Sequence, residues 1–274
     1  MYTYACTYHR PATLDDALRL AAEFPEAKFL AGGQTLVQAM KLRLAAPSDL
    51  IDIQNIAELQ GITDQGGNLR LGAMTRHAEV AGSSLVLSKN PALSELAACI
   101  GDRQVRNQGT IGGSVANNDP AADYPSAMLA LEATVITNRR EIAAGDFFAG
   151  MYSTVLEPDE LILAFSVPTP KRAAYSKFYS PASGFALTGV FVAQFESAVR
   201  VAVTGAASCV FRCARMEEVL SASFRPEALD AVRIDPAEYD LSDDLHASAG
   251  YRAKLCTVMA KRAVERALSR EGHA

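Results

Sequence analysis

Apolar and polar residues alternate along the chain in short runs, which predicts many small helices and strands rather than one repeated unit. Behind Thr13, a residue suited to capping a helix, apolar positions recur at helical spacing from Leu14 to Ala21. Glycine and proline separate the later runs. As far as residue 167 the pattern predicts, in order, a helix from Thr13, a strand at 27–31, a short helix through Met40 and Leu42, strands at 49–53 and 68–72, a helix from Pro91, a helix from Tyr124, and strands at 134–137 and 161–167.

The segment 168–172 divides this pattern from a different one. Its two prolines and two charged residues suit an exposed connection between domains. Beyond it the pattern predicts two adjacent strands at 185–196 and 199–207, and helices at 209–220 and 251–268. The last helix carries Tyr251, Leu255, Val258 and Met259 as its expected buried stripe. The outline is an α+β fold in two units.

Composition narrows the possible classes of protein. A chain of 274 residues with 49% hydrophobic and 21% charged residues is ordinary for a globular protein. Its net charge of −5 argues against nucleic acid as a partner. We find no apolar run of the roughly 18 residues that span a bilayer, and no layout typical of a secretory signal. The sequence therefore predicts a cytoplasmic protein with no transmembrane segment.

The cysteines and histidines do not suggest a metal site. Five scattered cysteines form no CxxC pair, which argues against both a disulfide framework and an iron–sulfur site. Cys209 and Cys213 could share one helix face, but two ligands do not complete a metal site. The four histidines lie far apart in the sequence. We therefore expect no metal and no catalytic residue in this chain; if metal chemistry serves its function, a partner supplies it.

Two glycine segments carry the candidate chemistry. Each pairs a double glycine with hydroxyl residues, and bare glycine amides can approach a phosphate closely and form an anion-binding nest. The chain has neither GxGxxG nor a GK dipeptide, so a Rossmann site or a P-loop is not supported. The candidate residues are Phe29, Leu30, Ala31, Gly32, Gly33, Gln34, Thr35 and Leu36 in the first segment, and Thr110, Ile111, Gly112, Gly113 and Ser114 in the second.

Two interpretations of these segments remain open at this point. Each could be no more than a tight turn beside a helix cap, because Gly-Gly is common in turns. Together they could grip a diphosphate from both sides, with Thr35, Thr110 and Ser114 as additional donors. Their matching chemistry favours the second interpretation.

The same segments resemble the FAD-binding subunits of molybdenum hydroxylases, with the greatest likeness to the carbon monoxide and xanthine dehydrogenase members. The likeness is carried by AGGQTLVQAMKLRL at 31–44 and QVRNQGTIGGSVANNDPAADYP at 104–125. It continues in PDELILAFSVP at 158–168, YSKF at 175–178 and YRAKLCTVMAKRAVERA at 251–267. It covers nearly the whole chain.

The resemblance implies a p-cresol methylhydroxylase-type FAD-binding domain over residues 1–170, made of α+β subdomains at about 1–56 and 57–170. A smaller C-terminal α/β domain, an antiparallel sheet with helices, would occupy residues 171–274. By resemblance, the first glycine segment wraps the FAD diphosphate and the second completes the cradle. Four further positions correspond to cofactor-binding residues of the family: Ile100, Asp123, Ile162 and Lys177.

Taken without the resemblance, these four residues have ordinary explanations. Ile100 and Ile162 would be core residues, and Lys177 a surface lysine. Asp123 precedes a predicted helix, where an acid is a favourable cap. The sequence also departs from the family, because Ser114 stands where many relatives have Asn. In addition, Gly184 stands where relatives often have an acid before the aromatic residue.

The resemblance further implies non-covalently bound FAD and two partner subunits. A large subunit would carry molybdopterin and a small subunit two 2Fe–2S clusters, assembled as a dimer of heterotrimers. This chain would pass electrons from the clusters to an external acceptor. Arg103 and Arg106, just before the second glycine segment, could form a docking edge or a solvated turn. A self-contained flavin oxidase or dehydrogenase of the same fold, or a non-catalytic nucleotide-binding module, are the alternatives.

Overall fold

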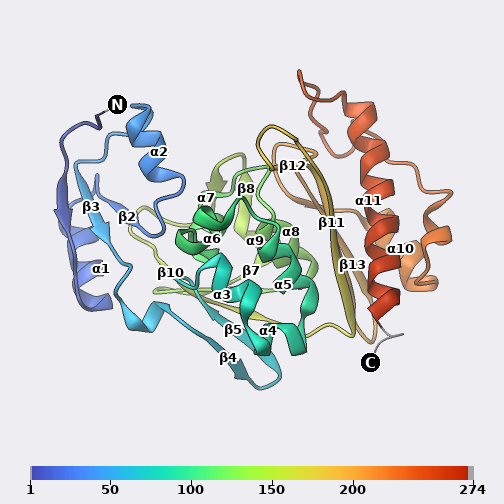
Figure 1. Cartoon of the computed structure of the whole chain (residues 1–274), viewed down its shortest axis with the longest axis horizontal. Coiled ribbons are helices and arrows are strands. Elements are labelled where there is room, and N and C mark those ends of the chain that lie inside the picture. The colour runs from blue at the N-terminus through green and yellow to red at the C-terminus, as the bar shows by residue number, and fades with distance from the viewer. Residues whose placement is uncertain (1, 271–274) are drawn as a thin grey trace.

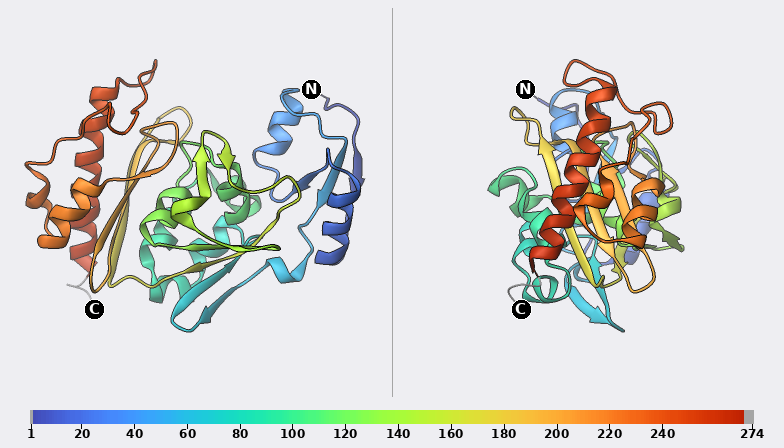
Figure 2. Two further views of the ribbon diagram at one scale, coloured as in Figure 1. Left: turned by 180° about the vertical axis from the view of Figure 1, so that it is seen from behind. Right: turned by 90° about the vertical axis from the view of Figure 1, so that its right-hand side faces the viewer.

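Three β-sheets of three or more strands stand side by side along the longest axis of the molecule, in the order of the sequence (Figure 1), and β8 and β9 form a separate two-stranded sheet. The structure is a computed structural model that describes residues 2–270. The last four residues of the predicted C-terminal domain therefore lie outside the described chain. Helices lie between the sheets and over the outer face of the third sheet (Figure 2). The predicted α+β class is confirmed, while the domain and subdomain boundaries stay predictions.

The first sheet is small and parallel, with strand order β1-β3-β2. Its helix α1 begins as predicted, because the Thr13 hydroxyl accepts a hydrogen bond of 3.2 Å from the N–H of Asp16. Ala17 and Ala21 on α1 are buried in a core with Ile51. The elements of this unit are β1 (Thr7–His9), α1 (Leu14–Glu23), β2 (Lys28–Leu30), α2 (Leu36–Lys41), β3 (Asp49–Asp52) and a 3-10 turn at Ala57–Leu59.

The second sheet is antiparallel, with order β4-β5-β10-β6-β7. Its central strand, β10, is the last of the five in the sequence and lies between β5 and β6. Helix α8 is buried along its whole length and forms the middle of the largest core. The elements are β4 (Ile62–Gln65), β5 (Asn68–Gly72), α3 (His77–Gly82), α4 (Ser84–Lys89), α5 (Pro91–Ala98), α6 (Arg103–Gln108), α7 (Ile111–Asn117), α8 (Tyr124–Ala130), β6 (Thr134–Thr137), β7 (Glu141–Ala143), α9 (Ala144–Phe147), the hairpin β8 (Phe148–Gly150) and β9 (Ser153–Thr154), and β10 (Ile162–Val167).

The third sheet is buried on both faces, which explains the long apolar runs in its strands. Val190 and Val192 face the core under the last helix, whereas Phe191 between them faces the core around α8. Figure 2 shows α11 lying along the outer face of this sheet. The elements are β11 (Arg172–Tyr179), β12 (Ala186–Gln194), β13 (Val199–Thr204), β14 (Phe211–Arg212), α10 (Ala214–Ala222), a 3-10 turn at Pro226–Leu229, and α11 (Ala249–Ser269).

Several sequence predictions for this unit are wrong in detail. The predicted helix at 209–220 begins at Ala214, because Phe211 and Arg212 pair with β13 as a strand. Cys209 therefore lies outside any helix and cannot share a helix face with Cys213. Strand β11 was not predicted from the pattern. Its residues 173–176 are buried in succession, so no alternation marks it.

The expected buried stripe of α11 is also only half right. Leu255 and Met259 are buried, but Tyr251 and Val258 are 45% and 40% exposed. Most of the other residues that α11 buries are small, and they share a core with the valines of the third sheet: Ala253, Cys256, Ala260, Ala263 and Ala267. Within residues 2–270, no helix is both long enough and apolar enough to cross a membrane.

Candidate functional site

A cavity of about 760 Å³ lies where the three units meet. Both glycine segments line it, as do the turn after α5, the turn before α8, the start of β10 and the β11–β12 hairpin. Its size is typical of a site for a small molecule or cofactor. Of the predicted site residues, the cavity is lined by Phe29, Ala31, Gly32, Gly33, Gln34, Thr35, Leu36, Ile100, Thr110, Gly112, Gly113, Ser114, Asp123 and Ile162.

Three predicted residues lie behind the cavity wall instead. Leu30 is the last residue of β2, and its carbonyl accepts a hydrogen bond from the N–H of Ile53. Ile111 is completely buried in the large core. Lys177 reaches toward the cavity from β11, but its ammonium group is occupied by protein oxygens. These residues support the wall rather than form it.

The two glycine segments touch each other through Gly32. A Cβ added at Gly32 would lie 2.1 Å from the carbonyl oxygen of Gln108 and 2.8 Å from the Cα of Gly109. Such distances are impossible for a real side chain, so glycine is required here for the backbones to approach. The contact joins the first unit to the second at one wall of the cavity, although the two segments lie about eighty positions apart in the sequence.

The backbone amides of the two segments are not equivalent. In the described part of the chain, the N–H groups of residues 32–35 have no hydrogen-bond partner in the protein. The N–H groups of Ile111 and Gly112, by contrast, donate to the carbonyls of Thr75 and Ala73. The first segment therefore offers the free donors that an anion requires.

The second segment is a helix start rather than a loop. The Thr110 hydroxyl accepts a hydrogen bond of 3.1 Å from the N–H of Gly113, and Gly112 and Gly113 lie in the first turn of α7. The helix-cap interpretation is thus right for this segment, yet the segment still forms a wall of the cavity. Arg103 and Arg106 likewise lie on a helix, α6, and not in a turn.

Asp123 is held by two side chains of β11. Its carboxylate accepts a hydrogen bond of 2.5 Å from the Tyr175 hydroxyl, and the Lys177 ammonium lies 3.1 Å from Oδ1. Burial raises the pKa of Asp123, while Lys177 and Tyr175 oppose that rise by favouring the charged form. Asp123 makes no capping hydrogen bond to α8, so the cap explanation is wrong.

The interpretation of Lys177 as an ordinary surface lysine is also wrong. Its side chain is only 8% exposed, and its ammonium group also donates to the carbonyls of Cys99 and Gly184. The Gly184 carbonyl therefore lies next to the Lys177 ammonium group. Gly184 itself lines the cavity.

His77 is a cavity residue that sequence reasoning missed. Its side chain packs against the Cα of Gly109, and burial lowers its pKa to about 4, with a further contribution from nearby Arg106. The imidazole is therefore neutral at physiological pH. No motif surrounds His77 in the sequence. The isolated bridge between Arg76 and Thr110 is what brings it beside the second segment.

The acidic and aromatic residues of the opposite wall were missed as well. Asp119 and Tyr152 line the cavity, and the Tyr152 hydroxyl donates to Asp119 across 3.3 Å. Glu160 also lines it, but its carboxylate is paired with Arg140, which lowers the pKa of Glu160 to about 2. Asp119 and Glu160 stand inside stretches that carry the family resemblance, at 104–125 and 158–168, yet neither was singled out there. Tyr152 lies in a turn without a motif.

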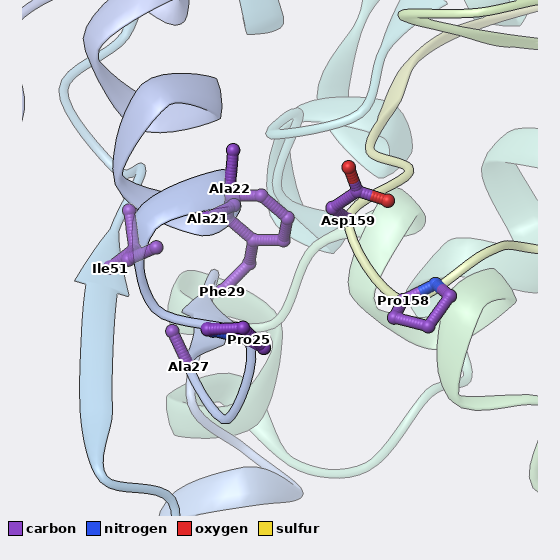
Figure 3. Close-up of a pocket in the computed structure, with 8 residues that line it drawn as sticks. All are labelled: Ala21, Ala22, Pro25, Ala27, Phe29, Ile51, Pro158 and Asp159. Carbon is purple, nitrogen blue, oxygen red and sulfur yellow. The ribbon is translucent and has the colours of Figure 1, made fainter.

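A second hollow of about 210 Å³ lies beside Phe29, between the first unit and Pro158 and Asp159, which precede β10 (Figure 3). Alanine, proline and isoleucine side chains make up most of its lining. Its charged residue, Asp159, is already paired with Arg139. The hollow therefore offers no unpaired charged side chain, and Phe29 is the residue that it shares with the large cavity.

Comparison with known proteins identifies the family. The model for the FAD binding domain in molybdopterin dehydrogenase matches residues 3–170. The chain belongs to this family. It is 35% identical to the carbon monoxide dehydrogenase medium chain of Hydrogenophaga pseudoflava, over 96% of this chain and 97% of that one. It is 34% identical to the nicotine 6-hydroxylase medium subunit of Paenarthrobacter nicotinovorans, over 97% and 98% of the two chains.

A solved structure agrees with this assignment. A chain in the structure of reconstituted CO dehydrogenase from Oligotropha carboxidovorans superimposes with a TM-score of 0.90 at 34% identity. The match covers 98% of this chain and all of that one. The predicted resemblance is confirmed, and the chain carries an FAD-binding domain.

The residues of the cavity fit FAD chemically. A diphosphate needs hydrogen-bond donors, which the free amides of residues 32–35 supply. Sugar hydroxyl groups need an acceptor, and the Asp123 carboxylate lines the cavity. A flat aromatic ring system needs apolar walls, and Ile100 and Ile162 provide part of one. Which residue contacts which part of FAD stays a prediction.

Proposed function

We propose that this chain is the flavoprotein subunit of a cytoplasmic molybdenum hydroxylase. It takes electrons from the 2Fe–2S clusters of a small subunit and passes them to an external acceptor, while a large molybdopterin subunit oxidises the substrate. The complex is a dimer of heterotrimers, and FAD is bound without a covalent link. Medium chains of several such enzymes are similar to this chain over nearly its whole length, which supports the proposal.

The observation that carries the proposal is the joint between the two glycine segments. Gly32 lies against the backbone of Gln108 and Gly109, and the free amides of residues 32–35 face the same cavity. A diphosphate in this cradle would connect the first unit to the second. Bound FAD would supply a group that accepts electrons singly and releases them in pairs.

The protein's own contribution is position and charge. The Asp123 carboxylate accepts hydrogen bonds from the sugar hydroxyls of FAD. Lys177, held by Asp123 and two carbonyls behind the wall, balances the negative charge of that carboxylate. Ile100 and Ile162 exclude water from the ring.

A first experiment tests cofactor identity and attachment. The purified chain is precipitated with acid, and the flavin released to the supernatant is identified by chromatography and counted per chain. We expect about one FAD per chain, all of it released. Yellow colour that stays in the pellet contradicts non-covalent binding, and a chain without flavin bands supports the nucleotide-binding module instead.

A second experiment tests the division of labour. The isolated chain and the complex co-purified from the native host are each mixed with candidate substrate in a stopped-flow spectrophotometer. We expect flavin bleaching by the complex and none by the isolated chain, and we expect molybdenum and iron in the complex. Rapid bleaching of the isolated chain would favour a self-contained flavin oxidase or dehydrogenase.

A further inference from the structure

The contacts of Tyr175 point beyond the predicted cofactor residues. Tyr175 and Lys177 lie two positions apart on β11, so their side chains leave the same face of the sheet. Both reach Asp123: the Tyr175 hydroxyl donates to Oδ1 at 2.5 Å, and the Lys177 ammonium lies 3.1 Å from Oδ1 and 3.2 Å from Oδ2. Tyr175 is only 3% exposed, so its phenol is committed to this contact.

The neighbouring strand leaves space for that phenol. Gly189 on β12 stands opposite Lys177 in the sheet. A Cβ added at Gly189 would lie 2.3 Å from the Tyr175 hydroxyl oxygen and 3.0 Å from its Cζ. Any larger residue at this position would push the phenol away from Asp123. Glycine in the middle of a long buried strand is otherwise unfavourable, so its presence here is explained by the close approach.

The third strand fixes the other side of the same segment. Thr204 on β13, which pairs with Gly189, donates its hydroxyl to the carbonyls of Pro120 and Ala122, at 3.0 and 2.6 Å. The N–H of Gly205 also donates to the Pro120 carbonyl. Strands β11 and β13 therefore hold the segment that ends in Asp123 at the cavity wall, and β12 between them leaves space for the Tyr175 ring.

We propose that Tyr175, seated over Gly189, is a positioning residue that keeps Asp123 an ionised hydrogen-bond acceptor for the hydroxyl groups of FAD. The inference rests on the proposed FAD site. A carboxylate offers about four acceptor positions. The hydroxyl of Tyr175 takes one on Oδ1 and the ammonium of Lys177 takes one on Oδ2, while the other two N–H groups of Lys177 donate to the carbonyls of Cys99 and Gly184. The carboxylate therefore keeps acceptor positions for a group in the cavity.

The charge on Asp123 depends on few neighbours. Burial raises its pKa, and Lys177 and Tyr175 oppose that rise. The other titratable groups that face it are Tyr124 on α8 and Cys99 at the end of α5, and burial raises the pKa of each, so both are neutral. Removing the phenolic hydrogen bond therefore raises the pKa of Asp123 further, and a protonated Asp123 accepts less well from FAD.

The test measures FAD binding to apoprotein by flavin fluorescence between pH 5 and 8. Tyr175→Phe removes one oxygen and keeps the ring stacked on Phe191. A hydrogen bond to a charged group changes an equilibrium by about tenfold or more, so we expect Kd for FAD to rise about tenfold at pH 6 and less at pH 8. The midpoint of the pH dependence should move to higher pH. Tyr251→Phe, at an exposed tyrosine of α11, is the matched control.

Gly189→Ala is a second, independent variant that tests the same contact. It should weaken FAD binding as Tyr175→Phe does, because the added Cβ displaces the phenol. In the double variant the losses should be less than additive, since the hydroxyl that Ala displaces is already absent. Thermal unfolding of the apoproteins shows whether each variant is folded; if one is not, the other decides.

The outcomes separate the inference from the proposed function. Wild-type chain that binds no FAD contradicts the proposed function. Wild-type binding with an unchanged affinity and pH profile in Tyr175→Phe overturns the role of Tyr175. Additive losses in the double variant would also overturn it, because they would indicate two unrelated packing defects.

Discussion

Replacing Gly32 by alanine should weaken FAD binding while leaving the fold intact. The added Cβ would lie 2.1 Å from the carbonyl oxygen of Gln108, whereas an ordinary C···O contact is about 3.3 Å. The two glycine segments must therefore separate by about 1 Å. Each segment belongs to a unit with its own core, so the apoprotein can accept this separation at little cost.

The cost falls on the FAD complex, because a diphosphate held by both segments requires them to be close. Overpacking of this kind costs about 1–3 kcal/mol. If the whole of this free energy is lost from FAD binding, Kd rises about 5- to 150-fold. Titration of apoprotein with FAD, followed by fluorescence quenching, measures the change directly.

The matched control is Gly82→Ala. Gly82 ends α3, and a Cβ there would meet no atom within 4 Å. Alanine in a helix is favoured over glycine by about 0.5–1 kcal/mol, so this variant should bind FAD normally and unfold at a slightly higher temperature. If Gly32→Ala keeps wild-type affinity and a wild-type melting temperature, the reasoning that joins the two segments through FAD is refuted.

Three further predictions follow from other walls of the cavity. Gly113→Glu should abolish FAD binding in a folded chain, because its Cβ meets only Thr110 Oγ1 and Ala31 Cβ and the carboxylate would enter the cradle; wild-type flavin content would contradict this. In the folded chain the pKa of His77 is about 4, whereas in the unfolded chain it is near 6.5. Between these values only the unfolded chain binds the proton, so the free energy of unfolding should fall by about 3 kcal/mol as the pH decreases from 6.5 to 4. Denaturant titrations at several pH values should show that the free energy of unfolding of His77→Gln depends less on pH than that of the wild type. Arg103→Glu, at an exposed position of α6, should slow flavin reduction by the partner subunits without releasing FAD, and an unchanged rate would exclude α6 as a docking edge.

Arg106 would not serve for the docking test, although it also precedes the second glycine segment. Its guanidinium donates to the carbonyls of Ile100 and Gly101, both of which line the cavity. Charge reversal at Arg106 would therefore disturb the cofactor wall itself. The sequence shows two similar arginines, and the structure separates an exposed one from one that shapes the site.

The parts of the fold that follow local rules could be predicted from the sequence. Thr13 caps α1, Pro91 is the first residue of α5, and β6 spans Thr134–Thr137 as the pattern indicates. Strand β11 could not be predicted from the pattern, because its successive buried residues give no alternation of apolar and polar positions. The start of α10 was misplaced because pairing with β13 overrides local helix preference, and no single-sequence pattern contains that pairing.

The site was found through two short segments, but its supporting contacts were not. Free amides at residues 32–35 and occupied amides at residues 111–113 look alike in sequence, since both follow a double-glycine pattern. The difference arises because α7 packs against the turn that contains Ala73 and Thr75. His77 and Tyr175 owe their positions to contacts across more than thirty residues, which composition and spacing do not encode.

The cavity also shows that the cofactor site is not confined to the part of the chain that carries the family motifs. The family model ends at residue 170, yet Ser183, Gly184 and Phe185 line the cavity from the third unit. Lys177 and Tyr175 hold Asp123 from the same unit, and Thr204 holds the segment before it. A glycine cradle without this sheet would keep its amide donors and lose the support of its carboxylate. The third unit is therefore a structural part of the proposed FAD site, which explains why a strand as buried as β12 carries a glycine where packing alone would favour a larger residue.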